Sequence, residues 1–197
     1  MCRFTAAFPE VPWAFIYRDT VEVLKSHLNG GTRTTPRVCT RLMGLDPIMQ
    51  PPTTMQIIKE SGKSLRELTL IEYCAAHLAG LSLSAVQEHG RHNSKIANSD
   101  DVPGGRFVNY NQMPDIVWNE ILPDHFGVNP LPTDAIENMQ KTAGVYSKGR
   151  GPKANQEWNE DTTVKQDTAT PEVINAVNLF ASKVYKQMQE LSSSSSK

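Results

Sequence analysis

Residues 13–28 join three segments in an order typical of α/β proteins: an apolar β-prone stretch, a charged turn and an amphipathic run. The stretch from Trp13 to Tyr17 predicts a buried strand, and the run after the turn predicts a helix. Asp19, with Glu22 three residues later, is an Asp version of the capping box, which marks where that helix begins. Open α/β sheets bind ligands at the carboxyl ends of their strands, so we expect a ligand near this turn.

Arg18 and Ser26, eight residues apart, are the candidate binding residues of this unit. Backbone N–H groups of the first helical turn, with Arg18 beside them, predict an anion site. Ser26 lies about 10 Å along the helix, so both residues reach one phosphate only if the ligand lies along the helix flank. The same residues also fit a surface ion pair and a small polar residue on a helix, and both interpretations stay open.

The small number of predicted strands limits the size of the sheet that this chain can form. A parallel strand needs neighbouring strands and helices over both faces, and the chief further candidate is the stretch from Arg106 to Tyr110. We therefore expect a helix-rich α/β domain with few parallel strands, the amino-terminally incomplete version of a larger protein. The alternative is a mostly helical architecture in which residues 13–17 are not extended.

Composition narrows the possible partners. The chain has 197 residues, 39% of them hydrophobic, enough for one ordinary domain with a core. Its net charge of −1 argues against nucleic-acid and anionic-membrane partners. Since the sequence contains neither a signal peptide nor an apolar run of about 18 residues, we expect a soluble, cytoplasmic protein.

Cysteine and histidine spacing predicts neither a disulfide framework nor a metal site. Cys2, Cys39 and Cys74 are widely spaced and form no Cys-x-x-Cys pair, which favours free thiols in a reducing compartment. Three histidines of the central region lack a matching set of carboxylates. We expect them at the surface or half-buried: His77, His89 and His92.

The rest of the chain predicts helices and loops within one domain over residues 1–191. Prolines interrupt residues 30–63, whereas Ser64 with Glu67 forms a capping box before one long helix or two consecutive helices that reach His89. The remaining expected elements are a loop at 91–105, helices at 113–126, 133–142 and 171–191, and a disordered Ser-rich tail at 192–197.

A basic loop is expected at residues 146–153, where three cations accompany two glycines. Glycine lets a backbone approach an anion closely, so Lys148, Gly149 and Arg150 are further candidate anion-binding residues. The alternative is a solvated loop that binds nothing.

Three segments, in this order, resemble the sulfotransferases, which transfer a sulfuryl group from 3′-phosphoadenosine 5′-phosphosulfate (PAPS). In that family an Arg at a strand end and a Ser eight residues later hold the nucleotide's 3′-phosphate, and Arg18 and Ser26 match them. Residues 108–113 and 125–128 resemble the family's Tyr-ended strand, turn, helix and Phe-Gly. The loop with Lys148, Gly149 and Arg150 loosely resembles the late basic loop that closes over the same phosphate.

The sequence departs from the family at several points. Thr20 stands where the family usually has Pro, Asn111 and Gln112 replace an acidic pair, and the loop order is Lys-Gly-Arg instead of Arg-Lys-Gly. The sequence contains no Gly/Ser/Thr-rich phosphate loop, so the resemblance covers roughly the carboxyl-terminal two-thirds of a sulfotransferase domain.

The resemblance implies a partial three-layer domain of the P-loop type. Its co-substrate would be PAPS, its acceptor a hydroxyl or amine, and it would use no metal. Without the phosphosulfate loop, we expect the chain to hold the 3′ end of the nucleotide but not to activate the sulfuryl group alone. No catalytic residue is assigned. The alternative is a non-catalytic domain, either a degenerate sulfotransferase relative or a helical interaction module.

Overall fold

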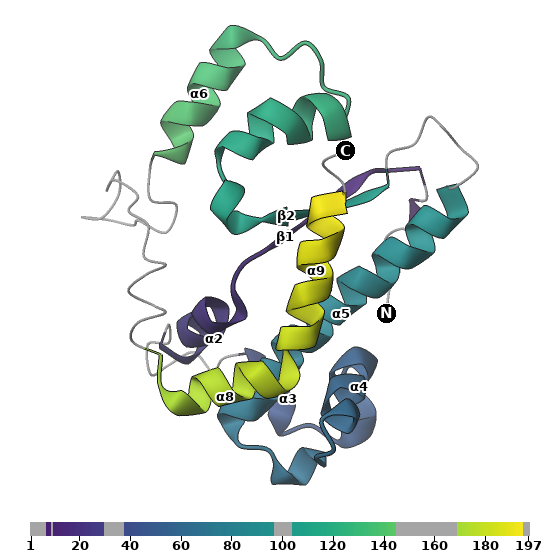
Figure 1. Cartoon of the computed structure of the whole chain (residues 1–197), viewed down its shortest axis with the longest axis vertical. Helices are drawn as coiled ribbons and strands as arrows, with labels where there is room; N and C mark the ends of the chain where they lie inside the picture. The colour runs from purple at the N-terminus through teal and green to yellow at the C-terminus, as the bar shows by residue number, and fades with distance from the viewer. Residues whose placement is uncertain (1–6, 9, 30–37, 97–103, 145–168, 195–197) are drawn as a thin grey trace. The chain divides into compact units, whose positions relative to one another are not determined.

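The computed structural model describes residues 7–8, 10–29, 38–96, 104–144 and 169–194. The chain divides into two compact units: unit 1 comprises Met1–Asn109 and Thr163–Lys197, and unit 2 comprises Tyr110–Thr162 (Figure 1). None of the helices described is long and apolar enough to cross a membrane.

Unit 1 contains a parallel sheet of two strands, β1 (Trp13–Tyr17) and β2 (Gly105–Asn109). Trp13 is paired with Gly105 at one end of the sheet and Tyr17 with Asn109 at the other. The predicted strand at residues 13–17 is confirmed, as is the helix-rich α/β class with a small parallel sheet. The second strand lies one residue earlier than predicted, because Tyr110 already belongs to a 3₁₀ helix.

The two strands differ in burial. Residues 105–108 of β2 are all buried, and β2 contacts both α5 (Leu70–Ile96) and α9 (Ser182–Ser194). In contrast, β1 is only partly covered, and Ile16 is 51% exposed. The strand that precedes the candidate binding residues is therefore open to solvent along part of its length.

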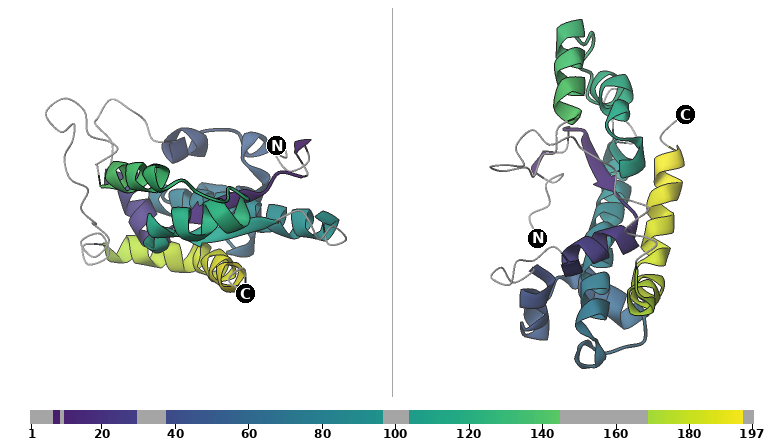
Figure 2. Two further views of the ribbon diagram at one scale, coloured as in Figure 1. Left: turned by 90° about the horizontal axis from the view of Figure 1, so that it is seen from above. Right: turned by 90° about the vertical axis from the view of Figure 1, so that its left-hand side faces the viewer.

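Helix α5 is the centre of unit 1. It contacts helices from both ends of the chain as well as β2, as the two orientations of Figure 2 show. Besides α5 and α9, the helices in the described part of unit 1 are α2 (Thr20–Asn29), α3 (Val38–Met43), η1 (Pro47–Met49), α4 (Pro52–Glu60), η2 (Leu65–Glu67) and α8 (Pro171–Phe180).

Two successive capping boxes lead into α5. The predicted box of Ser64 and Glu67 is present, but it caps η2 rather than the long helix. The long helix starts after a second box, in which the Thr69 N–H donates to Glu72 Oε2 (2.9 Å) and the Glu72 N–H donates to Thr69 Oγ1 (3.2 Å). One long helix thus follows, as one of the two predicted alternatives.

As predicted, the prolines confine the described part of residues 30–63 to short elements, and Pro52 occupies the first turn of α4, where its missing N–H costs no hydrogen bond. Several predicted boundaries are wrong. Helix α5 continues to Ile96, into the predicted loop. The predicted helix at 171–191 is two helices separated at Ala181, and α9 includes Ser192–Ser194 of the tail that was expected to be disordered.

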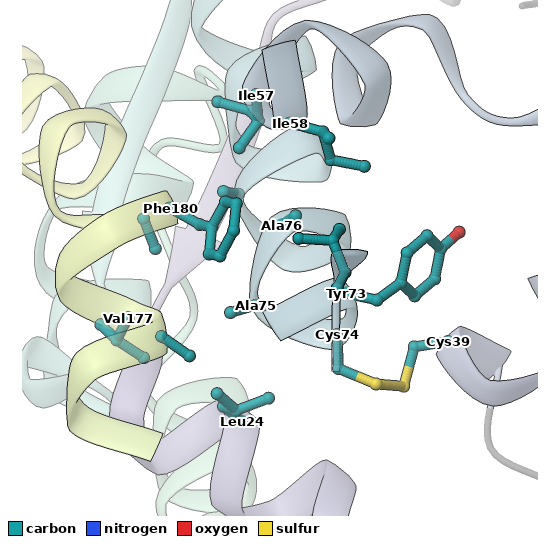
Figure 3. Close-up of a cluster of buried hydrophobic side chains, with 14 of the residues drawn as sticks. Leu24, Cys39, Ile57, Ile58, Tyr73, Cys74, Ala75, Ala76, Val177 and Phe180 are labelled. Carbon is teal, nitrogen blue, oxygen red and sulfur yellow. A yellow bond between two sulfur atoms is a disulfide. The ribbon is translucent and has the colours of Figure 1, made fainter. Parts of the chain in front are cut away.

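The main hydrophobic core, called the α5 core here, packs small and aliphatic side chains of α2, α3, α4, α8 and α9 against α5 (Figure 3). It contains a disulfide between Cys39 of α3 and Cys74 of α5, whose Cα atoms are 5.2 Å apart. The prediction of free thiols is therefore wrong for these two residues. Cysteine spacing gave no sign of the pair, because 35 residues separate the two positions and only helix packing brings them together.

Histidine burial also differs from the prediction. His77 and His92 are buried, with 6% and 1% of their surface exposed. The ring of His77 stacks on that of Tyr73, and burial, with His27 nearby, lowers the pKa of His77. At the other end of α5, Trp13 Nε1 donates to Nδ1 of His92 (3.2 Å). Both histidines are thus part of the packing of α5.

Glycine at position 80 permits the closest helix contact of the α5 core. A Cβ atom built onto Gly80 would lie 2.6–2.8 Å from Oγ1, N and Cα of Thr54 in α4. Two of these atoms are backbone atoms that cannot move aside independently of the helix. The backbones of α4 and α5 therefore approach each other at a distance that only glycine allows.

Unit 2 is helical where it is described. It consists of η3 (Tyr110–Gln112), the π-helix η4 (Val117–His125) and α6 (Thr133–Ala143). Both predicted helices are confirmed in position, although the first is of the π type and contains Pro123. A hollow of about 420 Å³ lies between η4 and α6, with Trp118 and Met139 among its lining residues.

Candidate functional site

The candidate site lies at the carboxyl end of β1. Strand β1 ends at Tyr17, and α2 begins at Thr20, so Arg18 and Asp19 form the turn between them. Asn109, the last residue of β2, is paired with Tyr17 at the same end of the sheet. The predicted strand-turn-helix unit is confirmed, and it places Arg18 where parallel sheets commonly bind ligands.

Asp19 caps α2. Its Oδ1 atom accepts hydrogen bonds from the backbone N–H groups of Val21 (2.8 Å) and Glu22 (3.4 Å). The predicted cap is confirmed, but it engages two of the first-turn N–H groups that were expected to face an anion. An anion at this helix start would compete with the Asp19 carboxylate for them.

Arg18 forms an ion pair with Glu22, in which its Nε–H donates to Glu22 Oε2. The Glu22 side chain is 1% exposed and that of Arg18 is 20% exposed. A carboxylate buried to this extent requires a cationic partner, so Arg18 already has a structural role without any ligand. The ion-pair interpretation of Arg18 therefore describes this structure, although its partner is buried rather than at the surface.

The guanidinium of Arg18 nevertheless belongs to a side chain that stays partly open to solvent. An arginine side chain carries five N–H donors in a planar fork, and a bond through Nε holds that plane in a fixed orientation. Because one-fifth of the Arg18 side chain remains exposed, solvent-borne anions can reach it. Arg18 is thus paired with the buried Glu22 carboxylate and is also accessible from solvent.

Ser26 is exposed on α2, one helical turn beyond Glu22. Within the described part of the chain, no hydrogen bond joins it to Arg18. One turn corresponds to about 5.4 Å, so a ligand that binds both residues would have to extend along α2. The predicted requirement, a ligand that extends along the flank of α2, therefore also holds in this structure.

Tyr185 and Asn109 are site residues that sequence reasoning missed. The ring of Tyr185, from α9, lies 5.8 Å from that of Tyr17 in an edge-to-face arrangement. Burial raises the pKa of the Tyr185 hydroxyl, and the nearby charge of Asp19 adds to this effect, whereas a hydrogen bond with the Asn109 side chain opposes it. Tyr185 is thus a neutral hydroxyl beside the Arg18 turn.

In the sequence, Tyr185 lies within the predicted helix at 171–191, among apolar residues that share a helix face with it. The available signal was weak: a tyrosine and an asparagine carry polar groups on an otherwise apolar face and at a strand end, but 76 positions separate them. Only the packing of α9 against β2 brings them together.

The other predicted binding residues, Lys148, Gly149 and Arg150, lie outside the described residues. Their role stays a prediction. Among the residues that are described, no group of three or more His, Cys, Asp or Glu side chains is arranged to hold a metal ion.

Comparison with protein-family models, with curated proteins and with solved structures finds no match for this chain. The resemblance to sulfotransferases therefore rests on the sequence segments that carry it. The candidate site itself is defined by the Arg18–Glu22 pair, the Asp19 cap and the Tyr185 hydroxyl at the end of the sheet.

Proposed function

We propose that the carboxyl end of the β1–β2 sheet binds the 3′-phosphate of PAPS and that the chain is a sulfotransferase-family protein. The observation that carries the proposal is the position of Arg18, directly after β1 and directly before α2. In the sulfotransferase resemblance, an arginine at this point of a strand-turn-helix unit holds that phosphate.

The Arg18–Glu22 pair is compatible with this role. A phosphate monoester carries nearly two negative charges and accepts paired hydrogen bonds from a guanidinium. Glu22 accepts from the Nε–H of Arg18, and the proposal requires a phosphate to accept from other N–H groups of the same guanidinium. In this proposal Glu22 orients Arg18, and the Ser26 hydroxyl contacts a more distant part of the same ligand.

The remaining assignments follow the order of segments along the chain. Lys148, Gly149 and Arg150 would supply the basic loop that covers the 3′-phosphate. The sulfuryl group would be transferred to a hydroxyl or amine acceptor, with no metal required. The proposal assigns residues to the 3′ end of the nucleotide and leaves the catalytic base unassigned.

Calorimetry with 3′-phosphoadenosine 5′-phosphate tests the proposal on the purified chain. We expect saturable binding that weakens at least about tenfold in Arg18→Ala, because a charge-assisted paired hydrogen bond is lost. Adenosine 5′-monophosphate lacks the 3′-phosphate. Its affinity should therefore be low and the same for the unaltered chain and for Arg18→Ala.

Arg91→Ala is the matched control. Arg91 also pairs with a glutamate on its own helix, Glu88, but it lies near the far end of α5 and not at the candidate site. Its loss should leave nucleotide binding unchanged. Binding that Arg18→Ala and Arg91→Ala reduce equally, or no binding at all, would reject the proposed phosphate site.

A second candidate function is a non-catalytic helical interaction domain. The observation that favours it is that Glu22 neutralises Arg18 in the absence of any ligand. This candidate predicts that neither 3′-phosphoadenosine 5′-phosphate nor PAPS binds, so the same calorimetric measurement separates the two functions.

A further inference from the structure

We propose that unit 1 has a second binding site, beside α4, for a small amphiphile with an aliphatic tail and one anionic head group. The site is a hollow of about 570 Å³ that lies against η1, the end of α4 and η2. A hollow of this volume is in the range of small-molecule sites. Neither Arg18 nor Ser26 lines it, so this proposal is independent of the proposed nucleotide site.

The walls of the hollow are aliphatic. Met55 and Ile58 lie three residues apart on one face of α4, and Leu65 of η2 also lines the hollow. Gly62 makes this arrangement possible: its φ of 78° lies in the left-handed region and turns the chain back after α4. The result is an apolar recess built from two consecutive elements.

The absence of aromatic side chains from this lining decides which tail fits. Nucleobases and other flat rings are usually held by stacking on aromatic side chains. Flexible methionine and leucine side chains instead adapt to an alkyl chain. Each methylene group that enters such a recess tightens binding about fourfold.

The rim of the hollow carries three cations, Lys59, Lys63 and Arg66. Lys63 is held by an ion pair with Glu72, with 2.5 Å between Nζ and Oε1. Lys59 and Arg66 are exposed, and neither has an ion-pair partner among the residues that the structure describes. Two exposed cations with no ion-pair partner in the described part of the chain therefore stand beside an aliphatic recess, whose lining includes a single carboxylate.

The one carboxylate of the lining is already engaged. Glu67 Oε2 accepts hydrogen bonds from the Ser64 N–H (2.7 Å) and the Ser64 hydroxyl (2.6 Å). These hydrogen bonds lower the pKa of Glu67, which keeps it ionised and directed toward the cap of η2. Because the whole chain has a net charge of −1, the excess of cations here is a local feature that matches an anionic head group.

Apolar surface continues from the hollow onto η1. Pro47 lines the recess, and the next residues, Ile48 and Met49, are 90% and 66% exposed. Neighbouring large apolar side chains exposed to this extent are characteristic of ligand-binding surfaces. An alkyl tail that leaves the recess past Pro47 would cover part of this surface.

Methyl NMR of the full chain with ¹³C-labelled methionine tests the proposal, with hexanoate and octanoate as probes. We expect octanoate to shift the Met55 methyl signal saturably and to bind roughly tenfold or more tightly than hexanoate, because it has two more methylene groups. Met188, which is buried in a different cluster, provides the internal control and should not shift. Equal affinity for the two acids, or no saturable shift at Met55, overturns the proposal.

Charge is tested with the double variant Lys59→Ala/Arg66→Ala, which should weaken octanoate binding about tenfold. The matched control, Lys186→Ala/Arg91→Ala, removes the same two charge types from exposed positions on α9 and α5 and should change nothing. Octan-1-ol, which has the tail without the charge, should bind clearly more weakly than octanoate.

Three results would overturn the proposed head-group recognition. They are equal affinity for octan-1-ol and octanoate, unchanged binding in Lys59→Ala/Arg66→Ala, and an acidic amphipathic peptide that shifts Met55 when octanoate does not. The last result would identify this hollow as a protein-docking surface instead.

Discussion

The α5 core and the small sheet of unit 1 are stabilised in different ways. In the α5 core, many small and aliphatic side chains from several helices share the burial, and the Cys39–Cys74 disulfide joins two of those helices. Beside the sheet, a second cluster has three buried members among the residues that the structure describes: Tyr17, Phe107 and Met188. We call it the sheet cluster.

The candidate site is attached to both regions. Arg18 follows a strand of the sheet cluster, whereas Leu24 of the same α2 helix is completely buried in the α5 core. The α5 core can therefore hold α2 in place while β1 stays partly exposed. Arg18, in the turn between β1 and α2, depends also on the sheet cluster, which has fewer buried side chains than the α5 core.

The largest effect is expected from Phe107→Ala. Phe107 is 1% exposed and contacts the rings of Trp13, Phe15 and Tyr17 at centroid distances of 6.1, 5.6 and 6.4 Å. Removing the ring should lower the free energy of unfolding by about 3–5 kcal/mol, as measured by urea denaturation.

Amide hydrogen exchange shows which region loses stability in Phe107→Ala, the sheet cluster or the α5 core. Amide hydrogen exchange should accelerate in β1 and β2 of Phe107→Ala more than in α4 and α5. Phe126→Ala, which removes a ring that is 38% exposed, is the matched control and should cost about 1 kcal/mol or less. Equal acceleration in all elements would show that the two regions unfold as one.

Removal of the disulfide should have the next largest effect, and in the other region. Cys39→Ala/Cys74→Ala opens a covalent loop with a sequence separation of 35, which corresponds to a loss of about 3–4 kcal/mol in the chain-entropy account. Hydrogen exchange should accelerate first in α3, with β2 little affected. Cys2→Ala is the control and should leave the free energy of unfolding unchanged. Faster exchange in β2 than in α3 would contradict the separate stabilisation of the α5 core and the sheet cluster.

A smaller effect is expected from pH. Burial lowers the pKa of His77, and also that of His89, below the value of about 6.5 for an unfolded histidine. As the pH falls below about 6.5, the unfolded chain binds protons that the folded chain does not, so the free energy of unfolding decreases. The decrease approaches about 1.4 kcal/mol per pH unit for each such histidine over the range between its two pKa values.

Urea denaturation between about pH 7.5 and pH 5.5 measures this dependence. His77→Gln tests the α5 core and His89→Gln the sheet end, where the His89 ring lies 5.5 Å from that of Phe107. Each variant should flatten the pH profile. A stability that increases as the pH falls would refute the assigned direction of both pKa changes.

Features that depend on neighbouring residues were predictable from the sequence. The Asp19 cap and the Ser64–Glu67 capping box each involve hydrogen bonds over a few residues. The strand at 13–17 is indicated by a local run of apolar residues, although its hydrogen bonds join it to the distant β2. The apolar run and the spacing of capping groups contain this information directly. The Thr69–Glu72 box has the same spacing and is equally visible in the sequence, although only the first box was predicted.

Features that depend on tertiary packing were not predictable in this way. The Cys39–Cys74 disulfide, the Trp13–His92 hydrogen bond and the approach of Tyr185 to Tyr17 join residues that are far apart in sequence. Periodicity identifies which face of a helix is apolar, but it does not specify the residue on another element that this face meets.

The Arg18–Glu22 pair lies between these two cases. The four-residue spacing is visible in the sequence, yet Glu22 had two possible partners there: the backbone N–H of Asp19, as in a capping box, or the guanidinium. Burial of Glu22 favours the cation, because a desolvated carboxylate gains more from an opposite charge than from one amide. The local sequence pattern alone does not predict that Glu22 is buried.

Gly80 has a consequence for how freely sequences of this fold can diverge. Any side chain there would force α4 and α5 apart, whereas a Cβ at Gly90, ten positions later on the same helix, would meet nothing within 4 Å. Substitution should therefore be purged at the first glycine and neutral at the second. Of these two glycines on one helix, the described neighbours constrain the side chain at position 80 and leave position 90 open.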